Sequence, residues 1–164
     1  MSNIFETEAK IKQIIDELKA LSAQAGLANQ GEEERIITSV FLYKFLNDKF
    51  MYNLSKFAEE IGETIEEILK NENDELDAFY DTTSGDVAFG YEDTIQYLIN
   101  HVEQADFYKQ FDDALVRIAQ NTRNDIFAVE TAEGSYRPLF EPISTPVEPS
   151  NRNNFAKNIF GIIA

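Results

Sequence analysis

The pattern of apolar and polar positions along the chain predicts a protein built mainly from helices. Over residues 4 to 21, apolar side chains recur three and four positions apart with charged residues between them, as in an amphipathic helix. Residues 32 to 52 begin with three glutamates and are apolar on nearly every side, which predicts a central helix buried from several directions. The same spacing predicts helices over residues 95 to 102 and 107 to 119.

Shorter elements are predicted between these helices. Residues 54 to 61 indicate a separate short helix that ends near Gly62, because glycine is a common helix C-cap. Thr64 is a suitable N-cap for the helix after it, and another short helix is expected within residues 71 to 81. Residues 87 to 91 alternate between apolar and other side chains, which predicts a short extended segment.

The last quarter of the chain has a different character. Residues 126 to 129 and 136 to 140 are expected to form two short strands around a turn. Three prolines predict a linker over residues 141 to 151, which separates a helical N-terminal domain, residues 1 to 140, from an apolar segment. Residues 152 to 164 are expected to be the truncated start of a following segment or a docking helix.

These elements together predict a mainly α fold, a multi-helix orthogonal bundle with one or two short β hairpin-like segments. The composition fits one folded domain, because 43% of the 164 residues are hydrophobic and 12% are aromatic. No apolar run approaches the roughly 20 residues that span a bilayer. The chain has no cysteine, and its N-terminus lacks the order of a signal peptide. We therefore expect a cytoplasmic protein with no membrane partner.

The formal net charge of -16 makes the isolated chain a poor partner for the phosphate backbone of DNA. Acidic residues are densest from Glu59 to Asp93, where Lys70 is the only cation. This run is interpreted as a solvated acidic face, or as a mimic of nucleic acid. The candidates for contact with DNA phosphate are the scattered basic residues of the second half, Arg117, Arg123, Arg137, Arg152 and Lys157.

Groups suited to catalysis or metal binding are sparse. His101 is the single histidine, so a Ser-His-Asp triad and a paired-histidine metal site within one chain are both excluded. Its expected role is structural, as a cation that interacts with the dipole at the end of a helix. Asp112 and Asp113 are adjacent on a helix and point to different sides, which argues against paired acid-base work. Residues 71 to 77 resemble a calcium loop but lack its glycine. We assign no catalytic, cofactor-binding or metal-binding residue.

A run in the central helix, residues 41 to 49, reads Phe-Leu-Tyr-Lys-Phe-Leu-Asn-Asp-Lys. With the amphipathic helix before it, this run resembles the N-terminal helical domain of type I restriction-modification DNA methyltransferase subunits. The positions that carry the resemblance are Phe41, Leu42, Lys44, Phe45, Leu46, Asp48 and Lys49. The resemblance implies a domain that helps to close a cleft on DNA and that assembles with the specificity and restriction subunits.

The resemblance also implies a reaction that this chain does not carry out alone. The family transfers a methyl group from S-adenosylmethionine to adenine N6, using a glycine-containing cofactor loop and an Asn-Pro-Pro-aromatic motif. Neither motif occurs in residues 1 to 164. Methylation requires a flipped adenine to be stacked and hydrogen-bonded in a pocket. The chain is therefore expected to bind no cofactor itself, and S-adenosylmethionine is implied only for the full-length protein.

Two other interpretations of the sequence stay open. The acidic run between Glu59 and Asp93 is also typical of a complete small protein that mimics DNA and inhibits DNA-binding enzymes in trans. Alternatively, the chain is a non-catalytic helical adaptor that uses the apolar tail from Phe155 as its docking element.

Overall fold

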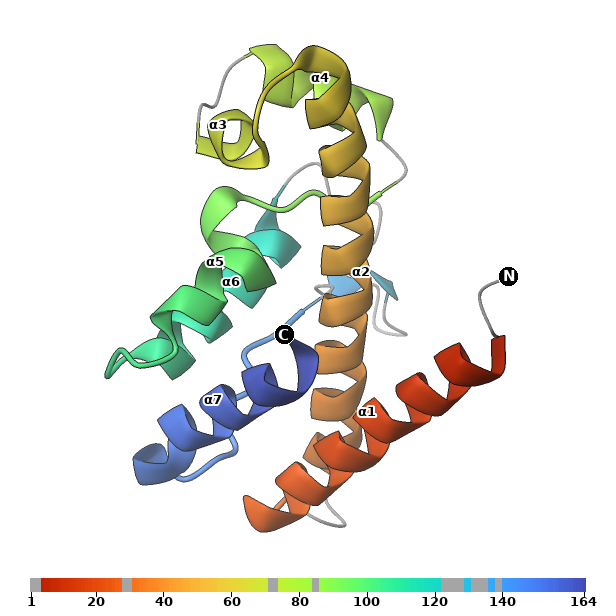
Figure 1. Cartoon of the computed structure of the whole chain (residues 1–164). Helices are drawn as coiled ribbons and strands as arrows, with labels where there is room; N and C mark the ends of the chain where they lie inside the picture. Colours follow the sequence, from red (N-terminus) through yellow and green to blue (C-terminus); the bar gives the residue numbers. More distant parts are fainter. Residues whose placement is uncertain are drawn as a thin grey trace.

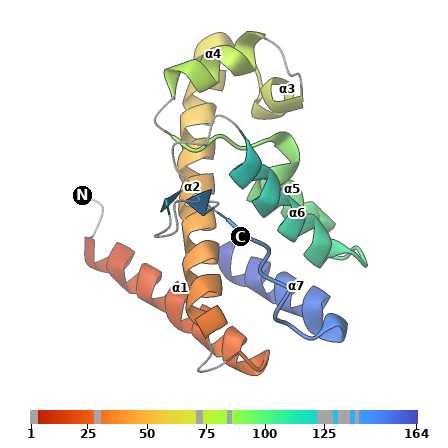
Figure 2. The same ribbon diagram turned by 180° about the vertical axis from the view of Figure 1, so that it is seen from behind.

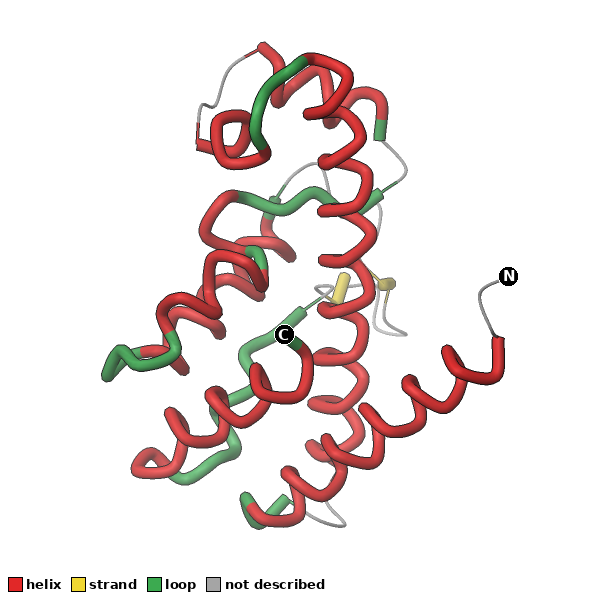
Figure 3. The backbone as a smooth tube through the Cα atoms, in the orientation of Figure 1, coloured by secondary structure: helices red, strands yellow, loops and turns green. Residues whose placement is uncertain are grey.

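The computed structural model describes residues 4–27, 31–70, 74–83, 86–121, 129–130, 136–137 and 140–164. The prediction of a mainly α fold is confirmed, since helices dominate the tube drawing of the backbone (Figure 3). The elements along the chain are α1 (Ile4–Gln24), α2 (Gly31–Ile61), α3 (Ile65–Lys70), α4 (Asp74–Thr82), the 3₁₀-helix η1 (Tyr91–Asp93), α5 (Ile95–Leu98), the 3₁₀-helix η2 (Ile99–His101), α6 (Phe107–Gln120), β1 (Val129–Glu130), β2 (Tyr136–Arg137), the 3₁₀-helix η4 (Pro149–Asn151) and α7 (Arg152–Ile163).

Helix α2 forms the long axis of the molecule, and the other helices lie around and across it (Figure 1). Its fully buried residues recur three and four positions apart between Ile36 and Ala58, and Phe41, Leu42 and Leu46 on adjoining faces are partly buried against the core. On the other side of the helix, Phe45 and Tyr52 are each 59% exposed. The prediction that this helix is buried from several directions is therefore confirmed for most of its circumference, since α1, α3 and α7 all contact it, but the face of Phe45 and Tyr52 is open.

The end of α2 corrects one prediction and confirms two. Residues 54 to 61 continue α2 without a break, so the prediction of a separate short helix is wrong. The helix ends where predicted, because Gly62 adopts the left-handed conformation at φ 72° that closes many helices. Thr64 caps α3 as predicted, since its Oγ1 accepts a hydrogen bond from the backbone N–H of Glu67 at 3.1 Å.

Helix α1 crosses the start of α2, and its N-terminal half extends away from the rest of the bundle (Figures 1 and 2). Leu18, Leu21 and Leu27 are buried against the bundle. The side chains of residues 7 to 13 are all exposed. The amphipathic pattern therefore predicts the helix correctly, but only its C-terminal half uses the apolar face for packing.

The short helices α3 and α4 lie at the C-terminal end of α2 (Figures 1 and 2). Phe79 on α4 is 1% exposed, and its ring contacts the rings of Phe50 and Phe57 on α2 at centroid distances of 5.7 and 5.3 Å. The segment before η1 was expected to alternate, but Val87, Ala88 and Phe89 are all buried. The predicted extended segment is not helical from residue 87 to residue 90, where Gly90 has an extended backbone, whereas Tyr91 already belongs to η1; the segment inserts into the core.

Helices α5, α6 and α7 lie on one side of α2 (Figures 1 and 2). The predicted helix over residues 95 to 102 is α5 continued by η2, and the predicted helix from Phe107 is α6. Helix α7 packs on α6 through Phe160, whose ring meets Phe107 and Phe111 edge-on at centroid distances of 5.0 and 4.8 Å. These rings form the part of the core that lies between α6 and α7.

Residues 140 to 147, which we name the strap, lead from the β1–β2 pair towards α7. Phe140, Ile143 and Val147 on the strap are each at most 2% exposed. The stretch that was expected to be a linker thus supplies side chains to the core, and α7 buries its own apolar face in the same core. In this structure the strap and α7 belong to the same bundle as α2.

Strands β1 and β2 form a two-residue antiparallel pair, with Val129 opposite Arg137 and Glu130 opposite Tyr136. Residues 126 to 128, 138 and 139 of the two expected strands lie outside the described residues. The larger hairpin-like segment therefore stays a prediction.

Candidate functional site

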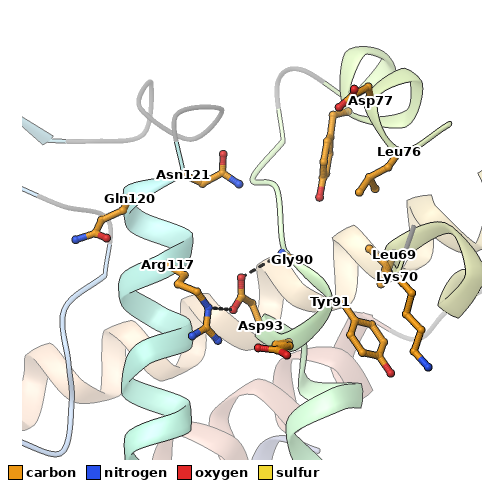
Figure 4. A pocket seen from close by; sticks show the side chains of 12 residues that line it. Leu69, Lys70, Leu76, Asp77, Gly90, Tyr91, Asp93, Arg117, Gln120 and Asn121 are labelled. Atoms are coloured by element: carbon orange, nitrogen blue, oxygen red, sulfur yellow. Dashed lines mark hydrogen bonds and ion pairs between the residues drawn. The ribbon is translucent and has the colours of Figure 1, made fainter. Parts of the chain in front are cut away.

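A cleft of about 950 Å³ opens between α3 and α4 on one side and the C-terminal end of α6 on the other (Figure 4). Residues 90 to 93 form its base, and most of the lining is polar or charged. The residues that line the cleft are Leu69, Lys70, Leu76, Asp77, Tyr80, Gly90, Tyr91, Glu92, Asp93, Arg117, Gln120 and Asn121. Concave sites with a few fixed polar groups are the usual places where proteins bind ligands.

An ion pair between Asp93 and Arg117 fixes the base of the cleft. Asp93 Oδ1 accepts a hydrogen bond from Arg117 Nε at 2.7 Å, and its Oδ2 accepts one from the backbone N–H of Gly90 at 3.2 Å (Figure 4). Asp93 is 6% exposed, and burial raises the pKa of its carboxyl group although the nearby guanidinium acts in the opposite direction. A Cβ on Gly90 would lie 2.9 Å from Asp93 Oδ2, so any larger residue at this position would displace the carboxylate.

A second ion pair lies on the opposite wall. Lys70 Nζ contacts Glu66 Oε1 at 2.6 Å, and it sits 5.4 Å from the centroid of the Tyr91 ring. The hydrogen bond between Lys70 and Glu66 raises the pKa of Lys70 and lowers the pKa of Glu66. Both cations of the cleft, Lys70 and Arg117, are therefore held by carboxylates of the same chain. This arrangement suits a site that binds a ligand better than a site that transfers protons.

The basic residues predicted to contact DNA are not gathered into one surface. Arg117 lies in the cleft, whereas Arg152 donates to the carbonyl oxygens of Val147 and Thr145 at 2.9 and 3.1 Å. The third described cation, Lys157, pairs with Glu103 at 2.7 Å. The side chains of Arg123 and Arg137 lie outside the described residues.

Their positions along α6 also keep these cations apart. The Arg152 guanidinium lies 6.0 Å from the ring of Tyr108 near the start of α6. Arg117 lies nine residues further along the same helix, which corresponds to about 13 Å at 1.5 Å per residue. Each described candidate has a partner within this chain, so a DNA phosphate would have to compete with it.

The polar positions of the run that carries the family resemblance connect α2 to other parts of the bundle. Lys44 Nζ donates to the carbonyl oxygen of Ile163 on α7 at 2.9 Å and pairs with Asp48 at the same distance. Lys49 Nζ pairs with Asp86 Oδ1 at 2.8 Å. Among the apolar positions of the run, Phe41, Leu42 and Leu46 are half-buried against the core, whereas Phe45 is exposed.

Sequence reasoning did not assign a role to Asn47, which is fully buried on α2. Its Oδ1 accepts the backbone N–H of Ile95 at 2.9 Å, and its Nδ2 donates to Gln96 Oε1 at 3.2 Å. Asn47 thereby satisfies a free N–H group in the first turn of α5. An asparagine on the apolar face of a long helix is the signal that could have identified it.

Asp112 was correctly predicted to point away from its neighbour Asp113. Asp112 is 9% exposed, and its Oδ1 accepts the backbone N–H groups of Ile143 and Ser144 at 2.9 and 3.3 Å, while Asp113 is exposed. Burial raises the pKa of Asp112.

His101 lies at the end of η2, and its Nδ1 is 2.8 Å from the carbonyl oxygen of Tyr97. This contact within the helix gives His101 a structural role.

No three side chains able to hold a metal ion converge in the part of the chain that the structure describes. Among the same residues, no helix combines the length and apolar character needed to cross a membrane. Comparison of the chain with protein-family models, curated proteins and solved structures gave no match.

Proposed function

We propose that this chain is the N-terminal helical domain of a type I restriction-modification DNA methyltransferase subunit. In the full-length protein, adenine N6 would be methylated with S-adenosylmethionine. The domain would assist closure of the DNA cleft and assembly with the specificity and restriction subunits in the cytoplasm. The proposal assigns no catalytic step and no bound cofactor to the residues of this chain.

The placement of the family-like run carries this proposal. The run occupies the middle of α2, and its lysines contact α7 and the segment before η1 through Ile163 and Asp86. Asn47, within the same run, holds the start of α5. Two of the residues that carry the resemblance, Lys44 and Lys49, thus connect elements of this bundle, which supports a resemblance that extends to the fold.

The sequence of the native locus downstream of codon 164 is the direct test of the proposal. We expect one reading frame to continue into a glycine-rich cofactor loop after a strand, followed by an Asn-Pro-Pro-aromatic motif. The first motif would bind S-adenosylmethionine, and the second would hold the flipped adenine. A continuing frame without either motif, or a stop codon at this point, would contradict the proposal.

The predicted DNA contacts can be tested in the assembled enzyme with Lys157→Glu. The variant removes only a surface ion pair, because the side chains of Lys157 and Glu103 are 47% and 79% exposed. We expect weaker DNA binding and a salt dependence that is smaller by about one ion per lost phosphate contact. Lys109→Glu on the exposed side of α6 is the matched control. Equal DNA affinity of both variants and the parent would remove Lys157 from the contact.

A DNA mimic is the second candidate function, favoured by the exposed acidic surface at the end of α2 and on α3 and α4. Its exposed carboxylates include Glu59, Glu60, Glu66, Glu67, Asp77 and Asp81. Crowding there is visible in Glu63, whose pKa is raised by a hydrogen bond with Glu75. Addition of the purified chain to a type I restriction enzyme distinguishes the candidates, since a mimic inhibits cleavage in trans and an isolated subunit domain does not.

The adaptor hypothesis has less support. Phe155, Ile159 and Phe160 of the tail that was expected to dock a partner are buried in the bundle. Their apolar surface is already used for packing against α6 and α1. An adaptor would therefore need a different docking surface.

A further inference from the structure

We draw no further inference here: the strongest candidate, the cleft between α3 and α4 on one side and the C-terminal end of α6 on the other, has both of its cations, Lys70 and Arg117, paired with carboxylates of this chain, and nothing in the structure shows which ligand fills it.

Discussion

Helix α2 and the strap both contribute to the core, but they satisfy their backbone polar groups in different ways. Within α2 the backbone N–H and C=O groups bond to each other, and only side chains decide which face is buried. The strap has no helix or strand in residues 140 to 147, so charged side chains of distant elements bond its backbone. Asp112 accepts from Ile143 and Ser144, and Arg35 donates to the carbonyl oxygen of Pro142 at 3.2 Å.

This difference has a consequence for stability. The structure of α2 is spread over many equivalent hydrogen bonds, whereas the strap depends on a few side chains, each buried or half-buried. Single substitutions at those anchors should therefore be costly, and substitutions on the open face of α2 should be nearly neutral.

The largest expected effect compares two phenylalanines. Phe160→Ala on α7 should lower the free energy of unfolding by about 3 to 5 kcal/mol, because a fully buried ring that contacts Phe107 and Phe111 is removed. Phe45→Ala on α2 should change it by about 0.5 kcal/mol or less, because that ring is 59% exposed. Urea denaturation followed by circular dichroism measures both. Equal losses in the two variants would contradict the assignment of α7 to the core.

The second effect concerns the carboxylate that anchors the strap. Asp112→Ala should cost about 2 to 3 kcal/mol, because two buried backbone N–H groups lose their acceptor. Asp113→Ala, one position along and exposed, is the matched control and should cost little. If both alanine variants unfold at the same urea concentration, Asp112 does not hold the strap.

A smaller effect is expected at the other anchor of the strap. Arg35→Met keeps the length of the side chain but removes the hydrogen bond to Pro142 and the ion pair with Glu32 at 2.7 Å. Because this side chain is 21% exposed, we expect a loss of about 1 kcal/mol. Thermal unfolding measures it, with Lys109→Met on the surface of α6 as the control. A loss as large as that of Asp112→Ala would mean that the anchors have been ranked in the wrong order.

The smallest expected effect is a change with pH in the stability difference between the parent chain and an Asp112 variant. Burial raises the pKa of Asp112 above its ordinary value of 3.8, so the folded chain binds the proton more tightly than the unfolded chain does. Protonation of Asp112 therefore stabilises the folded chain. This stabilisation is fully present below the pKa that Asp112 has in the unfolded chain, and it is lost as the pH rises through the pKa that Asp112 has in the folded chain. Asp112→Asn cannot titrate, so the parent should gain stability relative to this variant as the pH falls from about 7 towards about 4. A difference that stays constant, or moves the other way, would exclude this linkage.

The helices of the fold could be predicted from the sequence because their signals are local. Each signal involves residues only a few positions apart in the sequence: apolar residues spaced by three and four, Thr64 as an N-cap, and Gly62 as the end of a helix. The role of the strap could not be predicted in this way. Its anchors lie 31 residues away at Asp112 and 107 residues away at Arg35, and no local pattern reports such distances.

The cleft was predictable only in part. Arg117 was selected as a cation, but its buried partner Asp93 lies 24 residues earlier, within a run that was interpreted as a solvated acidic face. The close contact of Gly90 with that carboxylate also depends on tertiary folding. Composition identifies charged residues but does not show which of them are buried together.

We infer that the strap and α7 form one cooperative unit with α2. Native-state hydrogen exchange measured by NMR tests it most directly, because amides in one cooperative unit open with the same free energy. We predict that the buried amides of α7, from Ile159 to Ile163, exchange with the same opening free energy as those of α2 between Val40 and Leu54. Exchange of the α7 amides at a clearly lower free energy, while the α2 amides keep the higher one, would contradict it.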